Sequence, residues 1–173
     1  MPTIFTHAVV PIAAAILLDK KQISAPLIVV GILAAMAPDA DVIAFGLGIE
    51  YAHELGHRGA SHSIFFALLL GLMAMALHKL LKVGKLLAFG FVSGCAATHG
   101  FLDMFTNGGL GVAYYWPWSN ARHFFAMRPI EVSPIGIAAF FSERGAKVIV
   151  SELIWVWAPL LLLSTIGAKF LKK

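Results

Sequence analysis

Eight of the nine lysines in this chain lie in three short clusters, and each cluster follows an apolar segment. The clusters occupy positions 20–21, 79–85 and 169–173. Lysine and arginine concentrate on the cytoplasmic side of membrane proteins, so the clusters predict three cytoplasmic turns or ends. When the apolar segments cross the membrane in alternation, their opposite ends meet on the outer face. We therefore expect an outer N-terminus, a cytoplasmic C-terminus and a group of histidines and aspartates at the outer ends of the segments.

The composition is that of a membrane protein. Of the 173 residues, 60% are hydrophobic and only 13% are charged, about half the charged share of a soluble domain. The net charge of +4 arises mostly from the lysine clusters, which orient the chain and bind anionic headgroups. Because no stripe of basic and aromatic residues is present, we expect membrane lipids rather than nucleic acid as partners. Residues 1–173 are expected to form one domain, and the oligomeric state is left open.

Five apolar segments approach the length of about 20 residues that a transmembrane helix needs. They cover residues 3–18, 24–45, 63–78, 83–106 and 148–168. They predict an all-α, multi-pass bundle of about five spans in the inner or plasma membrane. Glycines in the fourth segment predict close contact with a neighbouring helix, and these are Gly84, Gly90, Gly94 and Gly100. The aromatic segment 107–147 is expected at the outer interface, with 135–141 as an interfacial or re-entrant piece.

The clearest candidate ligands are His99 and Asp103, which lie four residues apart in the fourth segment. On a helix they share one face, so an imidazole and a carboxylate can bind one cation. The same spacing also suits an ordinary hydrogen-bonded pair. Ionisable groups are costly within a membrane segment, which favours the ligand interpretation. Asp39 and Asp41, at a similar depth in the second segment, are candidates too, although a helix cap and a solvated turn would also explain them.

Three histidines at the outer side complete the predicted metal site. His57 and His62 flank the turn before the third segment, and His7 lies near the outer end of the first. His78 lies beside cytoplasmic lysines and is expected to take no part. Mixed imidazole and carboxylate ligation suits zinc, our first expectation, and also manganese or iron. We expect one or two such ions, near which water becomes a nucleophile at neutral pH.

Two arginines, Arg58 and Arg122, lie on the outer side, where the lysine pattern gives no reason for them. One explanation is contact with lipid headgroups. The other is that their guanidinium groups bind a phosphate or carboxylate of the substrate and neutralise a developing oxyanion. In this second interpretation Asp39 is the candidate general base.

Five short motifs resemble one known family. They are THA near the start, PDAD in the second segment, HRGASHS before the third, HGFLDMFT in the fourth, and WPWS followed by Arg122. In order and spacing they are similar to the YdjM-like membrane-bound metal-dependent hydrolases, which include a LexA-regulated inner-membrane hydrolase. The resemblance spans residues 6 to 122. It implies a multi-pass membrane protein with metal-dependent hydrolase activity.

A more distant likeness concerns the order of the ligands in the all-helical zinc-dependent phospholipases C and single-strand nucleases. By that fold-level analogy the ligands would be His7, Asp41, His62, His99 and Asp103, with Asp103 bridging two metals. The chain shows neither the N-terminal tryptophan of those enzymes nor a second downstream histidine cluster. The analogy therefore implies one or two ions rather than three.

Three functions remain open from the sequence. The first is an enzyme that uses metal-activated water to hydrolyse a phosphoester of a lipid or lipid-linked substrate at the outer interface. The second is a non-catalytic membrane scaffold stabilised by metal. The third is a metal or solute transporter, which is disfavoured because the polar residues gather at one face.

Overall fold

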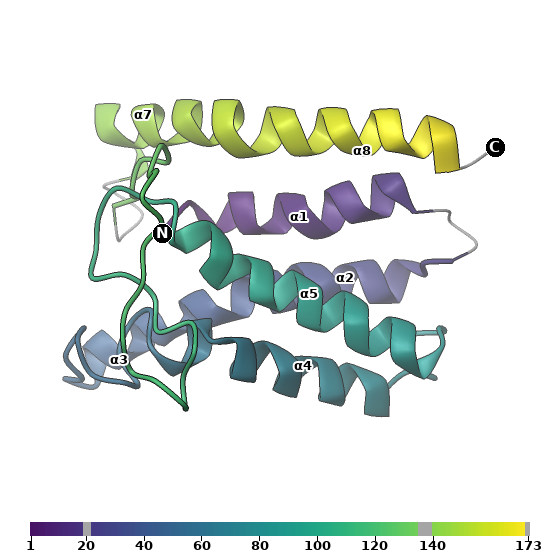
Figure 1. Ribbon diagram of the computed structural model, residues 1–173, viewed down its shortest axis with the longest axis horizontal. Coiled ribbons are helices and arrows are strands. Elements are labelled where there is room, and N and C mark those ends of the chain that lie inside the picture. The colour runs from purple at the N-terminus through teal and green to yellow at the C-terminus, as the bar shows by residue number, and fades with distance from the viewer. Residues whose placement is uncertain (19–21, 135–139, 172–173) are drawn as a thin grey trace.

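The structure is a computed structural model that describes residues 1–18, 22–134 and 140–171. Its helices lie side by side with their long axes roughly aligned (Figure 1). Within the described residues, extended structure is limited to two isolated β-bridges, Thr106 to Ile130 and Val112 to His123. The predicted all-α class is therefore confirmed.

The helices follow the five predicted segments closely. They are α1 (Ile4–Leu17), α2 (Ala25–Met36), α4 (Ile64–Ala76), α5 (Lys85–Asp103) and a last helix made of α7 (Glu143–Glu152), a π-helical turn (Leu153–Trp157) and α8 (Ala158–Leu171). After α2 the chain continues as the 3₁₀ helix η1 (Ala37–Val42) and the short α3 (Ile43–Gly46). The last helix begins before residue 148 because Ser142 caps it, accepting a hydrogen bond from the Gly145 amide.

Three of these helices are long and apolar enough to cross a membrane: Ala25–Gly46, Lys85–Asp103 and Glu143–Leu171. The helices α1 and α4 are apolar but have only 14 and 13 residues. At about 1.5 Å per residue each is roughly 20 Å long, shorter than a hydrocarbon core of about 30 Å. The two short helices therefore cover only part of the depth that the other three can span.

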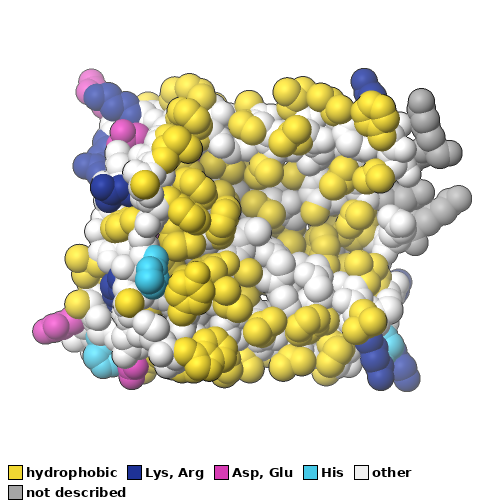
Figure 2. Space-filling model, viewed as in Figure 1, with side chains coloured by type: hydrophobic (Ala, Val, Ile, Leu, Met, Phe, Trp, Pro, Cys, Tyr) yellow, Lys and Arg dark blue, Asp and Glu magenta, His cyan; other side chains and the backbone are white. Residues whose placement is uncertain are grey.

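Charge and hydrophobicity divide the molecule along its long axis. Hydrophobic side chains cover the flank, whereas charged side chains gather at the two ends (Figure 2). The turn between α4 and α5, with its lysines, lies at the same end as the C-terminal part of α8 (Figure 1). The N-terminus and the loops after α3 and α5 lie at the opposite end. The lysine turn and the candidate ligands are thus separated as the sequence predicts.

Close packing between α4 and α5 depends on a glycine that the sequence analysis did not single out. A Cβ at Gly71 in α4 would collide with Ser93 Oγ and press on the Phe89 carbonyl in α5. The expectation for the fourth segment was largely wrong, because a Cβ at Gly84, Gly90 or Gly94 would meet nothing within 4 Å. These three glycines do not mediate a close contact. Gly100 does, because the backbone oxygen of His62 lies against it.

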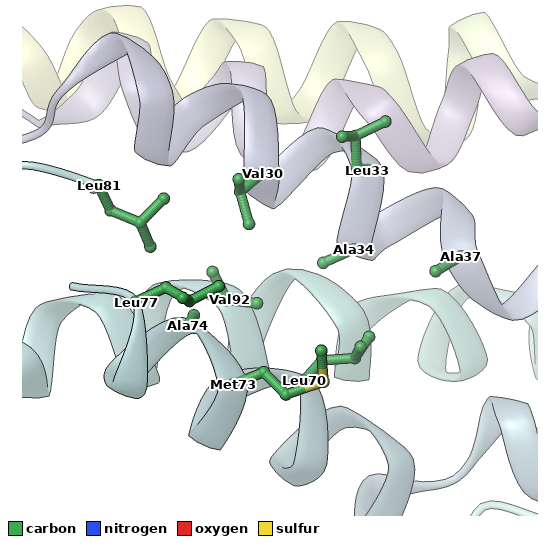
Figure 3. A pocket seen from close by; sticks show the side chains of 10 residues that line it. All are labelled: Val30, Leu33, Ala34, Ala37, Leu70, Met73, Ala74, Leu77, Leu81 and Val92. Atoms are coloured by element: carbon green, nitrogen blue, oxygen red, sulfur yellow. The ribbon is translucent and has the colours of Figure 1, made fainter. Parts of the chain in front are cut away.

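A small cavity of about 220 Å³ lies between α2, α4 and α5 (Figure 3). All ten side chains that line it are apolar, among them Val30, Leu70 and Val92. A cavity without polar groups offers no chemistry for catalysis or for binding an ion. It belongs to the helix packing rather than to the candidate site. The predicted interfacial piece 135–141 lies outside the described residues except for Phe140 and Phe141.

The orientation of the bundle remains a prediction that labelling can test. The native Cys95 is buried, so a thiol reagent can label an introduced, exposed cysteine selectively. In intact cells with an accessible outer face, a membrane-impermeant thiol reagent should label Glu54→Cys and spare Lys79→Cys, because both sites are exposed at opposite ends. After permeabilisation both should react. Labelling of Lys79→Cys alone in intact cells would reverse the orientation.

Candidate metal centre

Five buried polar side chains from four segments converge at the end of the bundle opposite the lysine turn. None of them is more than 4% exposed. They are His7 of α1, Asp39 of η1, His62 of the short 3₁₀ helix η2 (Ala60–His62), and His99 and Asp103 of α5. Since buried ionisable groups destabilise a fold unless they are compensated, their convergence calls for a ligand or a proton network.

Histidine nitrogens and carboxylate oxygens face one another across short distances. His62 Nε2 lies 3.1 Å from His99 Nε2, and Asp39 Oδ1 lies 3.3 Å from His99 Nε2. Asp103 Oδ2 lies 3.6 Å from His62 Nε2, and its Oδ1 lies 3.6 Å from His7 Nε2. The rings of His7 and His99 stack with centroids 3.6 Å apart. The predicted depth match between the second and fourth segments is thus realised as direct proximity.

Several of these atoms have no hydrogen-bond partner within the described residues. They are both ring nitrogens of His7 and both carboxylate oxygens of Asp39 and Asp103. Two trios of ligand atoms, each within 4.8 Å of one another, could hold a metal ion: His7, His99 and Asp103, and Asp39, His57 and His62. The trios adjoin, as the His62–His99 contact shows. Unpartnered donors of this mixed type fit zinc, manganese or iron.

Two groups behind the histidines fix the direction in which their rings point. His99 Nδ1 lies 2.7 Å from the carbonyl oxygen of Ala35, which can only accept, so Nδ1 carries the proton and Nε2 faces the centre. Asp41 contacts His57 Nδ1 at 2.6 Å and His62 Nδ1 at 3.1 Å. Such partners commonly orient metal-binding imidazoles. The structure places Asp41 behind the rings rather than among the inward-facing donors.

Asp41 also fixes the loop that carries these histidines. Its Oδ2 accepts hydrogen bonds from the Arg58 amide at 3.1 Å and from Ser61 Oγ at 2.6 Å. Burial lowers the pKa of His62, but contacts with Asp39 and Asp41 outweigh burial and raise the pKa to about 9. The two carboxylates therefore favour the protonated imidazole of His62.

Arg58 is fully buried and contacts acceptors with all three side-chain nitrogens. Its Nε lies 2.9 Å from Asp103 Oδ2, an ion pair without hydrogen-bond geometry. One terminal nitrogen donates to the carbonyl of Gly108 and the other to Thr106 Oγ1, each at 2.9 Å. Its backbone adopts φ 62°, a left-handed conformation that side chains seldom take. This geometry fits a residue that positions Asp103 better than one that contacts a substrate.

Arg122 ties the histidine loop to the segment after α5. Its guanidinium donates to the carbonyls of His57 at 3.0 Å, Tyr51 at 3.0 Å and His53 at 3.1 Å. The phosphate-binding role expected from the sequence would require these contacts to be given up. The observed contacts instead favour a role in holding the loop in place. His78 lies at the lysine end, near the carbonyl of Val83, away from the centre.

The whole chain, residues 1–173, matches the family described as YdjM inner membrane protein. The chain is also 39% identical to the inner membrane protein YbcI of Escherichia coli (strain K12), over 94% of this chain and 95% of that protein. The chain belongs to the YdjM inner membrane protein family. No solved structure matches it. The family, the similar protein and the apolar helices together support an inner-membrane location.

The sequence analysis of this YdjM-family protein missed one buried residue near the centre, Glu152. Its carboxylate accepts hydrogen bonds from the amide and hydroxyl of Thr3 and from the hydroxyl of Thr6, the two hydroxyl contacts at 2.6 Å. Trp157 Nε1 also donates to Thr6 Oγ1 at 2.6 Å. These contacts hold the start of α1, one turn from His7. A glutamate within a long apolar helix was the signal that could have revealed it.

Metal content should depend on the inward-facing donors of the YdjM-family centre. The double variant His99→Ala, Asp103→Ala removes two of the three donors of one trio, so its metal content should fall well below that of the wild type. His78→Ala should retain the wild-type content because it lies at the other end. Elemental analysis by mass spectrometry of protein purified in detergent measures both. Full occupancy in the double variant would contradict this site.

Two alanine substitutions in α5, Gly100→Ala and Gly94→Ala, should affect the candidate metal centre differently. Gly100→Ala places a methyl group against the His62 backbone oxygen and the Tyr114 ring, so η2 must shift. We expect reduced metal content and a lower melting temperature. Gly94→Ala meets nothing within 4 Å and should change neither quantity. Equal behaviour of the two variants would show that η2 has room to move without disturbing His62.

Proposed function

We propose that this membrane protein is a metal-dependent hydrolase that cleaves a phosphoester of a lipid or lipid-linked substrate at the outer membrane interface. The observation that supports this most is the convergence of buried histidine and aspartate donors at one end of an apolar bundle, several of them without a hydrogen-bond partner in the described part of the chain. Buried and unpartnered ionisable groups mark functional sites because a fold has no structural reason to retain them.

The residues present divide into donors and supports. His7, His57, His62, His99 and Asp103 would hold one or two divalent ions, zinc by preference, with Asp41 and Arg58 fixing the donors in place. Such an ion supplies Lewis-acid chemistry that polarises a water and a phosphoryl oxygen. Neither carboxylate oxygen of Asp39 has a hydrogen-bond partner within the described residues, and Asp39 lines an open pocket, so it can accept a proton from a water there.

Aromatic side chains near the centre suit a substrate at headgroup level. Trp118 is 71% exposed and Tyr115 is 51% exposed, and both lie in the loop after α5. Phe65 at the start of α4 contacts the rings of Trp116 and Trp118, with centroids 5.7 and 5.9 Å apart. Tryptophan and tyrosine favour the membrane–water interface, which supports a position of the donors near the depth of lipid phosphates.

A metal-stabilised scaffold is the second candidate. The donors come from α1, η1, η2 and α5, so a bound ion would cross-link four segments without any reaction. The pocket beside Asp39 favours the hydrolase, because an ion with a purely structural role is normally closed off by its protein ligands. A transporter fits less well, since the described charged residues gather at the two ends of the bundle.

A hydrolysis assay with and without bound metal distinguishes these candidate functions. Protein in detergent should hydrolyse at least one member of a panel of phospholipids and lipid-linked phosphates, lose that activity in EDTA, and regain it when zinc or manganese is restored. His78→Ala should keep full turnover. If the metal is demonstrably bound and the whole panel remains intact, the scaffold becomes the better explanation. Metal flux into liposomes would instead favour a transporter.

A further inference from the structure

An open pocket of about 520 Å³ lies beside the metal centre, within the range of roughly 300–1,000 Å³ that ligand pockets usually have. It is bounded by the start of α1, by η1 and by residues on either side of the segment 135–139. The side chains that matter here are Ile4, Phe5, Asp39, Val42, Phe140 and Phe141. Far more of the pocket is apolar than polar.

The rim of this pocket is aromatic and exposed. Phe141 is 82% exposed and Phe5 is 56% exposed. The ring of Phe140 lies between them, with centroids 6.1 Å from Phe5 and 5.4 Å from Phe141. A contiguous apolar rim of this kind is unfavourable in water and marks a binding or membrane-facing surface. The rim is therefore chemically suited to contact with a hydrocarbon chain.

The inner end of the pocket is charged. Asp39 lines it, is 4% exposed, and has two carboxylate oxygens without a hydrogen-bond partner in the described residues. The same carboxylate lies 3.3 Å from His99 Nε2 in the metal centre. The pocket thus leads from an apolar rim to the proposed reacting groups. The cavity between α2, α4 and α5 has no such end, because apolar side chains line it throughout (Figure 3).

We infer that this pocket binds one acyl chain of a membrane phospholipid, so that the phosphate of that lipid lies at Asp39 and the metal donors. The two ends of such a lipid match the two ends of the pocket. An acyl chain suits the apolar walls, and an anionic headgroup suits a metal centre. The substrate enters sideways from the bilayer without first leaving it. This inference rests on the proposed hydrolase for its chemistry, but the binding step can be measured alone.

Filling the pocket tests the binding step. Ile4→Trp adds bulk to the pocket wall, whereas Ile12→Trp adds the same bulk to the same helix at nearly equal exposure, 38% against 40%. The probe is a phosphatidylglycerol with a diazirine in one acyl chain, in nanodiscs of unlabelled lipid. Wild type and Ile12→Trp should give saturable cross-links to peptides containing Phe5 or Phe140. Ile4→Trp should lose most of these cross-links while keeping its metal content.

A second pair of variants, at exposed positions, tests the pocket even if Ile4→Trp fails to fold. Phe141→Ser weakens the rim, and Phe170→Ser removes an equally large side chain that is 73% exposed on α8, far from the pocket. Phe141→Ser should reduce the cross-links severalfold and Phe170→Ser should not. Unchanged cross-linking in both Ile4→Trp and Phe141→Ser, with metal content and melting temperature retained, would overturn the inference.

Hydrolysis distinguishes failure of the pocket from failure of the proposed reaction. If the cross-links depend on the pocket but no phospholipid is cleaved, the acyl-chain site stands and the hydrolase does not. If phospholipids are cleaved while pocket variants cross-link and turn over like wild type, the hydrolase stands and the acyl-chain site does not. When both hold, Ile4→Trp should lose turnover of long-chain lipid and keep turnover of a water-soluble phosphoester.

Discussion

The cost of burying charge at the end of an apolar bundle governs this structure. Asp39 and Asp103 are almost completely enclosed, and each would lose several kcal/mol of hydration if nothing compensated it. Arg58 and the surrounding imidazoles supply part of the compensation. None of the four carboxylate oxygens has a hydrogen-bond partner within the described residues, so a bound cation would complement them. The loops and short helices at this end can be understood as the means of holding that charge balance in place.

Much of this arrangement follows from helix geometry that a sequence displays. The spacing of His99 and Asp103 puts both on one face of α5, and the lysine clusters set the end at which they lie. The sequence analysis also placed His7, Asp39 and His62 at matching depth, and the structure brings these residues together. Depth along a helix can be counted in residues, which is why these predictions worked.

The separate roles of Asp39 and Asp41 could not be predicted from their depth along the helix. Residues two apart point to different sides of a helix, so Asp39 and Asp41 cannot both face one centre from a regular turn. Pro38 lacks an amide hydrogen, and the chain tightens into the 3₁₀ helix η1 there. Asp39 then faces the donors and Asp41 faces the loop. The roles of Arg58 and Arg122 depend on loop conformation, which residue spacing does not encode.

The contact between α1 and Glu152 has a consequence for the order in which the protein can be assembled. Thr3 and Thr6 belong to the first helix made, yet the carboxylate that binds them follows 146 to 149 residues later. His7 likewise contacts Asp103, which follows 96 residues later in the chain. A helix of 14 residues with three polar groups near its start is poorly suited to remain in lipid by itself. The contacts that hold the start of α1 in place are therefore complete only once Glu152, near the other end of the chain, has joined the bundle.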